Sequence, residues 1–422
     1  MTAVPEHQSR TVQPELRPRA RKLTPAHMLL GAAGLLVLLS LVRVLTGADD
    51  ITSAGTTSAA LGLAVPIGMA GMGALWAERA GIVNIGLEGM LILGTWGAGY
   101  AGYLYGPWAG VGLAVAMGAA GGLIHAVATV SFGVDHVVSG VAVILLGTGT
   151  AQYLSSVAYE GVPGGGDTQS PPIDNLPVLS VPGVGGPLGD LEARGWFLVS
   201  DVAGILRGVL TATSVLTLIA IALVVLTWFV LWRTAFGLRL RACGERPEAA
   251  ESLGVNVYTM KYVAVVVSGA FAGFGGAFLA IAAASAYREG QTGGRGFIGI
   301  AAMIFGNWRP GGTAAGAALF GYADALQLRR GGESVHALLL LLGVVLVAFG
   351  IWLILRGSRR GGITGLVVAV AVLTWFSLVD AVPGELTGLT PYVATLLVLG
   401  LAAQRLRPPA ANGLSYRKGT SA

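Results

Sequence analysis

The amino-acid sequence predicts an all-α, polytopic membrane protein, and three observations support this fold class. Hydrophobic residues make up 54% of the chain and charged residues only 11%, against about 25% charged residues in an ordinary soluble domain. The apolar residues form long runs, many of which reach the roughly 20 residues that a bilayer-crossing helix needs. The 66 glycines gather in these runs, and small residues four apart let membrane helices pack closely.

Run length divides the chain into about twelve candidate membrane spans. Segment 296–308 is short for a crossing, so it either crosses while tilted or buried by its neighbours, or it is re-entrant. Close helix packing is expected at the glycine pairs Gly118/Gly122, Gly269/Gly273 and Gly312/Gly316. The candidate spans are 27–47, 56–76, 88–105, 107–130, 137–157, 211–232, 262–285, 296–308, 311–328, 336–356, 362–380 and 388–403.

Basic residues predict the orientation, because cytoplasmic loops carry an excess of Lys and Arg. The basic tail 1–26 is polar and precedes a run long enough to span, so it is expected to be cytoplasmic rather than a cleavable signal peptide. Six spans later, loop 233–261 with its five basic residues is also expected inside. Segment 158–210 is rich in Gly and Pro and is expected to form an irregular external cap.

The later basic residues bear on whether segment 296–308 crosses. A full crossing places the cluster at 356–360 and the tail 405–422 inside, and leaves Arg329 and Arg330 outside as an exception. A re-entrant segment removes that exception but places both later clusters outside. The number of basic residues therefore favours a full crossing.

Charge and cysteine content limit the functional classes. The net charge of +5 comes from residues in short loops, which is typical of a membrane protein and does not indicate nucleic-acid binding. Cys243 is the only cysteine, so no intrachain disulfide and no cysteine-based metal site can form. The sequence contains no phosphate-binding loop, zinc-protease motif or nucleophile elbow. We therefore expect no catalysis, no cofactor and no metal site in this chain.

The cytoplasmic loop contains a short segment with strong helix signals. Gly244 is expected to end one helix, Pro247 to begin another, and Gly254 to end that one after about two turns. Small side chains give this helix a smooth face that suits docking into a groove on another protein, although an ordinary solvated connector is the alternative. The residues concerned are Gly244, Glu245, Pro247, Glu248, Ala249, Ala250 and Gly254.

The run 244–254 resembles the coupling loop of ABC importer permeases, at which the permease contacts its ATPase. Segments 77–90, 294–306 and 320–327 narrow the resemblance to the simple-sugar and nucleoside permease family, closest to its nucleoside-type members. The resemblance implies an ATPase partner that binds the ATP, a second permease subunit in a heterodimer, and an extracellular solute-binding lipoprotein. An ion-coupled secondary transporter of a small neutral solute is the alternative.

The sequence departs from that family in two places. Arg246 stands where relatives usually carry Asn. Residues 331–385 add two apolar spans between the core 27–330 and the last core helix, 386–404, so about ten core helices and two extra C-terminal spans are expected. An even number of added spans preserves the orientation of the last helix.

Polar residues within or beside the apolar runs are candidates for the translocation pathway, since ionisable groups at membrane depth usually face a cavity or a partner. In the family that this chain resembles, the stretch 78–88 is a broken helix beside the pathway. This implies that Asn84 and Glu88 line it, with a plain cytoplasmic turn as the alternative, and Asp324 and Gln327 are further candidates.

Other polar residues receive structural interpretations. Glu78 and Arg79 are expected to form a surface pair. His125 is expected to make an interhelical hydrogen bond, and Asp135 and His136 to be solvated.

Segments 81–85 and 296–300 are faintly similar, as in an inverted repeat, although chance similarity explains so short a match equally well.

Overall fold

The computed structural model describes residues 25–329, 331–388 and 406–419, and this part of the chain is almost entirely helical. Its strands are a single antiparallel pair of two residues each, β1 (Val178–Leu179) and β2 (Thr213–Ser214). Seven of the described helices are long and apolar enough to cross a membrane. The structure therefore confirms an all-α membrane bundle.

The helices of the first half follow the predicted spans closely. Ser53 caps α2 and Asp135 caps α5 through side-chain oxygens that accept backbone N–H groups, the usual role of such residues at a helix start. The helices are α1 (Pro25–Thr46), a 3-10 turn (Asp49–Thr52), α2 (Ala54–Arg79), α3 (Leu87–Tyr105), α4 (Pro107–Ala126) with a π-helical extension (Val127–Ser131), and α5 (His136–Ala158).

The second half contains more short helices than the sequence suggested. They are α6 (Gly185–Ala193), α7 (Val199–Leu210), α8 (Val215–Arg233), α9 (Ala235–Glu245), α10 (Pro247–Ser252), α11 (Val257–Ala277) with a π-helical extension (Phe278–Ala283), α12 (Arg295–Phe305), α13 (Pro310–Leu328), α14 (Gly331–Leu355), α15 (Arg359–Leu378) and α16 (Gly384–Thr387). Beyond its first residue, the predicted span 388–403 lies outside the described residues.

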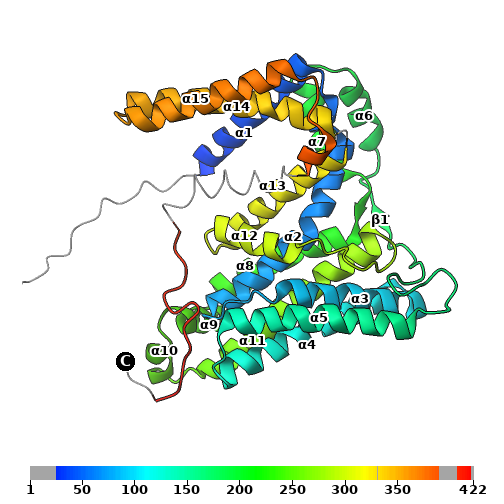
Figure 1. Ribbon diagram of the computed structural model, residues 1–422, viewed down its shortest axis with the longest axis vertical. Helices are drawn as coiled ribbons and strands as arrows, with labels where there is room; N and C mark the ends of the chain where they lie inside the picture. The colour runs from blue at the N-terminus through cyan, green and yellow to red at the C-terminus, as the bar shows by residue number, and fades with distance from the viewer. Residues whose placement is uncertain (1–24, 330, 389–405, 420–422) are drawn as a thin grey trace, which may run out of the picture.

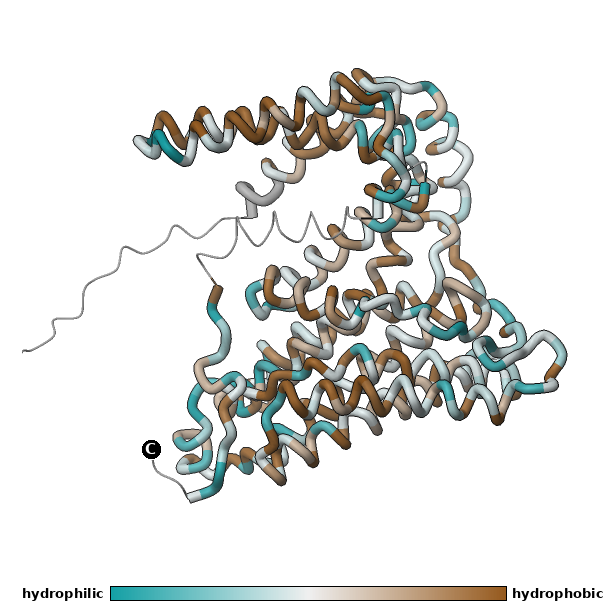
Figure 2. The backbone as a smooth tube through the Cα atoms, in the orientation of Figure 1, coloured by the Kyte–Doolittle hydropathy of each residue, from teal (hydrophilic) through white to brown (hydrophobic). Residues whose placement is uncertain are grey.

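The long helices run between two ends of the molecule (Figure 1). One end, here the α10 end, carries α9, α10 and the C-terminal segment; the opposite end, here the α7 end, carries α6, α7 and β1. The lengths between them are mostly hydrophobic, and hydrophilic residues gather at the two ends (Figure 2). Loop 233–261 and the described C-terminal segment, which the charge pattern places on one side of the membrane, thus share one end of the bundle.

Glycines bring the central helices into backbone contact, as their spacing predicted. A Cβ atom added at Gly118 of α4 would lie 2.3 Å from the carbonyl oxygen of Gly269 in α11, and one at Gly273 would lie 2.2 Å from the oxygen of Ala114. Gly94 of α3 also packs against Gly273. Helices α2, α3, α4 and α11 form a dense frame that positions the candidate site.

The segment predicted as span 296–308 is only partly helical. Helix α12 has 11 residues, a length of about 16 Å, or half of the roughly 30 Å hydrocarbon core of a bilayer. The irregular chain before it begins at the α7 end, where the Ser285 hydroxyl donates to Asn175 Oδ1. The turn after it reaches the α10 end, where Arg79 donates to the Trp308 carbonyl oxygen. The chain therefore runs from one end to the other, but only the second half of that path is helix.

Segment 158–210 is not wholly irregular, and that prediction is wrong for its second half. Helix α7 buries one face against the start of α2, and Asp201 on that face has no exposed side-chain surface. Its carboxylate lies 2.8 Å from Arg43 Nε and accepts hydrogen bonds of 2.5 Å from Ser40 and Thr52. The added order comes from this buried polar anchor, which joins α7 to α1 and the 3-10 turn.

Helices α14 and α15 form a hairpin along one edge of the bundle (Figure 1). Gly350 lies against Leu366 of the partner helix, and Ala337 attaches the hairpin to a cluster with Val42 and Ile51. The two ends of the hairpin are adjacent, because the Val382 amide donates to the Gly332 carbonyl oxygen at 3.1 Å. Residues 331–385 thus leave and rejoin the bundle at one place, which suits the predicted two-span insertion.

Candidate coupling helix and translocation pathway

The short helix α10 begins and ends where the sequence predicted. Pro247 occupies its first turn, and Gly254 adopts a φ of +81° just beyond its end, a conformation that favours glycine. Gly244 does not end the preceding helix, because α9 continues to Glu245. A Cβ atom at Gly244 would lie 2.3 Å from the Arg79 carbonyl oxygen, so this glycine allows α9 to approach the end of α2.

One side of α10 is exposed and the other is packed. Glu248, Ala249 and Leu253 face outward, and Leu253 is 84% exposed. Ala250 is only 3% exposed and packs with Cys243 and Val257. The predicted smooth face therefore includes Ala249 but not Ala250, because Ala250 is the residue that fixes α10 to α9 and α11.

A groove of about 540 Å³ opens beside α10, between its end, the start of α11 and the C-terminal segment. Its lining residues are Glu251, Gly254, Val255, Asn256, Val257, Tyr258, Thr259, Tyr416 and Lys418. The exposed Leu253 lies next to this groove in the chain.

The predicted broken helix is present between α2 and α3. Residues 80–86 are non-helical, and two histidines bind the backbone of Val83 in this turn. His125 Nε2 lies 3.1 Å from the Val83 carbonyl oxygen, and the Val83 amide donates to His136 Nδ1 at 3.2 Å. His125 also lies 2.8 Å from the Ser139 hydroxyl, which confirms the interhelical bond. His136 is 4% exposed, so its predicted solvation is wrong; it is buried because the turn folds over it.

Asn84 lies at the buried side of this turn. Its Nδ2 donates to the Ser268 hydroxyl of α11 at 2.9 Å, whereas its Oδ1 is buried without a hydrogen-bond partner in the described structure. A buried polar group without a partner costs free energy unless another group satisfies it. Asn84 therefore offers an acceptor for a water molecule or a passing polar solute.

Glu88 supports helix α12. Its two carboxylate oxygens accept from the backbone amides of Gly294 at 3.0 Å and Gly296 at 2.7 Å. These amides are the unpaired donors at the start of α12, and a carboxylate there also offsets the positive end of the helix dipole. Glu88 thus holds the half-length helix in place from the first turn of α3.

Asp324 faces a cation rather than an open space. Arg295 Nη2 lies 3.6 Å from its carboxylate, and both side chains are largely buried. Arg295 also donates to the carbonyl oxygens of Gln291 and Thr292, just before α12. Gln327 lies one turn further along α13, near Gly388 beyond α16, so the structure does not bring it to Asn84 or Glu88.

Glu78 and Arg79 do not form the predicted surface pair. Glu78 is 5% exposed and accepts from Trp308 Nε1 at 2.6 Å and from Asn412 Nδ2 at 2.7 Å. Arg79 bonds the Trp308 carbonyl oxygen and lies 3.9 Å from Glu245. The prediction fails because Trp308 and Asn412, which bury this end of α2, are more than 200 residues away in the sequence.

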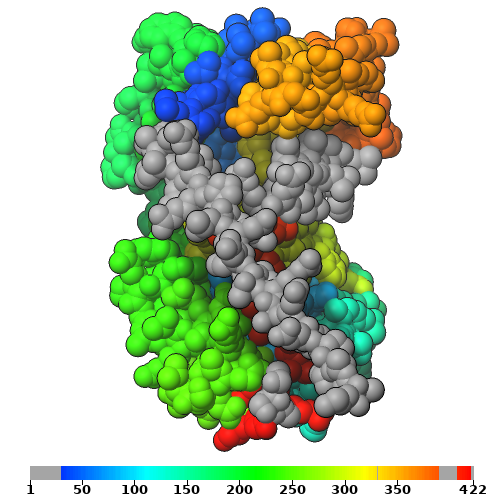
Figure 3. Space-filling view, turned by 90° about the vertical axis from the view of Figure 1, so that its left-hand side faces the viewer, coloured from blue at the N-terminus to red at the C-terminus, as the bar shows by residue number. Residues whose placement is uncertain are grey.

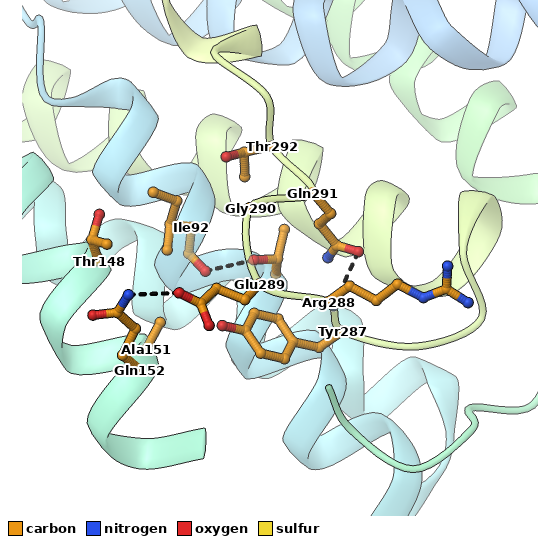
Figure 4. Close-up of a pocket in the computed structure, with 11 residues that line it drawn as sticks. Ile92, Thr148, Ala151, Gln152, Tyr287, Arg288, Glu289, Gly290, Gln291 and Thr292 are labelled. Carbon is orange, nitrogen blue, oxygen red and sulfur yellow. Dashed lines mark hydrogen bonds between the residues drawn. The ribbon is translucent and has the colours of Figure 1, made fainter. Parts of the chain in front are cut away.

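A pocket of about 120 Å³ lies between α3, α5 and the irregular segment before α12 (Figure 4). Gln152 of α5 points across it and donates to the Glu289 carboxylate at 2.6 Å. Thr95, Thr148 and Thr292 add hydroxyl groups to a lining that also includes the apolar side chains of Ile92 and Ala151. Arg288 points away from it (Figure 4). Sequence reasoning missed Gln152 and Glu289, because each is an ordinary polar residue at a span end until the fold brings them together.

The described residues contain no group of three or more His, Cys, Asp or Glu side chains that could hold a metal ion.

Comparison with known proteins identifies the family. Residues 56–350 match the family described as the branched-chain amino acid transport system permease component. The chain belongs to this family of ABC transporter permeases. It is therefore a multi-pass membrane protein and the permease subunit of an ABC importer. No solved structure matches the chain.

Curated relatives share most of the chain. The guanosine ABC transporter permease NupQ of Bacillus subtilis is 33% identical over 372 residues, which cover 86% of this chain and 96% of NupQ. The nucleoside ABC transporter permease NupC of Lactococcus lactis is 31% identical, with 84% of this chain and 93% of NupC covered. The putative glucose ABC transporter permease TsgC13 of Haloferax volcanii is 38% identical over 278 residues, which cover 66% of this chain and 78% of TsgC13.

Proposed function

We propose that this chain is the nucleoside-conducting permease of its importer, in the cell membrane with its N-terminus in the cytoplasm. In this proposal an ATPase binds the α10 end and supplies the ATP site, a solute-binding lipoprotein delivers the solute at the α7 end, and a second, different permease completes the channel. NupQ and NupC, which are named for nucleosides, match 86% and 84% of this chain, whereas the putative glucose permease TsgC13 matches 66%, and this wider match supports a nucleoside over a sugar. The observation that carries the ATPase contact is the firmly packed α10 with its exposed outer side.

Docking at α10 is supported by its rigidity and its surface. Ala250 is buried in the cluster that joins α10 to α9 and α11. Its packing fixes the orientation in which Ala249 and Leu253 are exposed. A small residue and an exposed leucine beside a groove of about 540 Å³ offer both a flat surface and a pocket for a partner side chain.

Substitutions on the outer side of α10 test this contact. We expect Ala249→Glu and Leu253→Glu to abolish capture of the ATPase by the detergent-purified permease, because each adds a charge that the partner must desolvate. Ser358→Glu is the matched control, since Ser358 is exposed in the loop between α14 and α15, away from α10. Normal ATPase capture and uptake by both α10 variants would contradict the proposed contact.

We infer that the solute passes the pocket between α3 and α5 and then the turn 80–86. The Gln152 carboxamide and the Glu289 carboxylate can exchange their mutual hydrogen bond for bonds to a nucleoside, which is neutral and polar, and the threonine hydroxyls add further polar groups. Asn84 then offers its unpaired Oδ1, and the Arg295–Asp324 pair lies beside α12. In this path Glu88 acts by holding α12, and Gln327 lies nearer the α16 edge.

Competition of uptake tests the solute class. We expect unlabelled uridine to inhibit uptake of labelled adenosine and ribose to leave it unchanged; the reverse result would contradict a nucleoside solute. Within the chain, we expect Glu289→Ala to raise the KM for uptake, because the pocket loses the acceptor that Gln152 binds. Arg288→Ala is the adjacent control and should leave the KM unchanged, since that side chain points away from the pocket.

A further inference from the structure

The C-terminal segment 406–419 lies along the α10 end and contacts several elements that are distant in sequence. The amide of Ala411 donates to the Gly244 carbonyl oxygen at 2.9 Å, and the amide of Gly413 donates to the Gly81 carbonyl oxygen at 3.2 Å. These two bonds join the end of α9 to the buried turn 80–86 through two residues of one segment. Figure 3 shows the red C-terminal segment against green residues at the bottom of the molecule.

Asn412 lies between Ala411 and Gly413 in the chain and makes a third hydrogen bond to the bundle. Its Nδ2 donates to Glu78 Oε2 at 2.7 Å, and the same carboxylate oxygen accepts from Trp308 Nε1 at 2.6 Å. Glu78 is the end of α2, and Trp308 belongs to the turn between α12 and α13. Asn412 therefore connects the C-terminal segment, through one buried carboxylate, to the end of the half-length helix.

The segment makes further contacts on both sides of Asn412 in the chain. Upstream, the Arg407 amide donates to Asn307 Oδ1 at 2.8 Å, again in the α12–α13 turn. Downstream, the Tyr416 hydroxyl donates to the Glu251 carboxylate of α10, and its ring lies 5.6 Å from the Tyr258 ring and 5.7 Å from Lys261 Nζ. The segment thus reaches α10 at one end and the α12–α13 turn at the other.

Local sequence explains why the segment holds one shape. Pro408 and Pro409 restrict the backbone of its first part. The amide of Asn412 donates to the Pro409 carbonyl oxygen, and Gly413 adopts a φ of +80°, which favours glycine. An Asn-Gly pair after prolines is typical of a tight turn. The turn points both Asn412 and the neighbouring amides at the bundle.

We propose that the C-terminal segment 406–419 transmits movement of the coupling helix α10 to the turn 80–86 and to α12, with Asn412 and Tyr416 as positioning residues. This inference rests on the proposed ATPase contact at α10. The direct packing of α10 reaches α9 and α11, whereas the segment bonds the turn that carries Asn84 and the turn that follows α12. A displacement of α10 would then move both of these turns together.

Cys243 provides a test that requires no transport. It is the only cysteine, it is fully buried, and it packs beneath α10 in the cluster that includes Ala250 and Tyr416. We expect Tyr416→Ala to speed maleimide labelling of Cys243 in the detergent-purified full chain by roughly tenfold or more, because the cluster opens more often. Ser415→Ala, an exposed neighbour, should label like the unaltered chain.

Hydrogen exchange on the same samples tests the connection itself. We expect Asn412→Ala to increase amide exchange in peptides covering both 80–86 and 247–254, and Ser415→Ala in neither. An increase confined to one of the two segments, or in neither, would overturn the proposal, as would unchanged Cys243 labelling in Tyr416→Ala.

Coupling is measured in the assembled transporter. We expect Asn412→Ala to retain ATPase capture and basal ATP hydrolysis but to lower the solute imported per ATP hydrolysed several-fold. An unchanged ratio would overturn the proposal, and so would loss of ATPase capture, because the segment would then only build the docking surface. If the unaltered chain itself captures no ATPase, the proposed function fails, and the labelling and exchange results still decide the internal connection.

Discussion

The glycines of α4 and α11 meet backbone to backbone, whereas glycines of the α14–α15 hairpin often meet the flexible ends of side chains. A Cβ atom at Gly273 would lie 2.2 Å from the Ala114 carbonyl oxygen. One at Gly343 would lie 2.4 Å from Cδ2 of Leu373, which can rotate away. Backbone cannot move without shifting a helix, so the central frame is fixed and the hairpin can adjust. Asn84 and Glu88, which belong to the proposed pathway, lie on or against the fixed part.

The largest expected effect comes from overfilling the frame. We expect Gly273→Leu to destabilise the protein by more than about 3 kcal/mol, since the added atoms have only backbone to displace. Monodisperse protein should be lost in size-exclusion chromatography, together with uptake. Gly343→Leu in the hairpin is the matched substitution and should leave much more folded protein. Equal losses would remove the distinction between the two regions.

The next largest effect concerns the ion pair that attaches α7 to the rest of the bundle. We expect Asp201→Ala to cost about 3 kcal/mol, because the Arg43 guanidinium loses its buried partner and keeps only the exposed Asp49 as a carboxylate partner. Ser40 and Thr52 also lose the acceptor that they share. Thermal unfolding in detergent measures this, and Asp190→Ala, on the α6 surface, is the control. A transition temperature unchanged by Asp201→Ala would show that packing of α7 on α2, and not the ion pair, anchors the α7 end.

Removal of the hairpin is expected to have a moderate effect. Residues 333–381 can be excised with a short linker, because the flanking Gly332 and Val382 are hydrogen-bonded to each other. We expect the shortened chain to fold and to keep part of its uptake, with some loss because Ala337 no longer covers Val42 and Ile51. Complete loss of folded protein would show that the hairpin belongs to the core.

The smallest effect should have the opposite sign. A Cβ atom at Gly365 of α15 meets its nearest neighbour at 3.5 Å, an ordinary contact. Gly365→Ala should therefore stabilise the chain by about 0.5–1 kcal/mol, the usual gain when alanine replaces glycine within a helix. Gly269→Ala in the frame should destabilise it, since its Cβ would lie 2.2 Å from the Gly118 carbonyl oxygen. Thermal unfolding of the two variants compares these signs directly.

Sequence reasoning succeeded where the signal was local. Apolar run length located the described spans, glycine spacing located the frame contacts, and Pro247 with Gly254 delimited α10. Each of these depends on residues that are close in the chain.

It failed where burial depends on partners from elsewhere. Glu78 and His136 are polar residues at span ends and looked solvated, but Asn412 and the turn 80–86 cover them. Segment 296–308 was correctly predicted to be short, but the sequence did not show that irregular chain before α12 covers the rest of the distance. The pocket required Gln152 and Glu289 to come together from segments 137 residues apart.

The half-length of α12 has an electrostatic consequence for permeation. A helix that starts midway along the bundle presents about half a positive charge at its first turn, and the Glu88 carboxylate lies directly on that point. Arg295 and Asp324 cancel each other a short distance away. An uncharged molecule crosses such a region with little electrostatic penalty, whereas an ion must disturb one of these balanced pairs. On the proposed path, the same arrangement that holds the helix would therefore also oppose the leakage of ions.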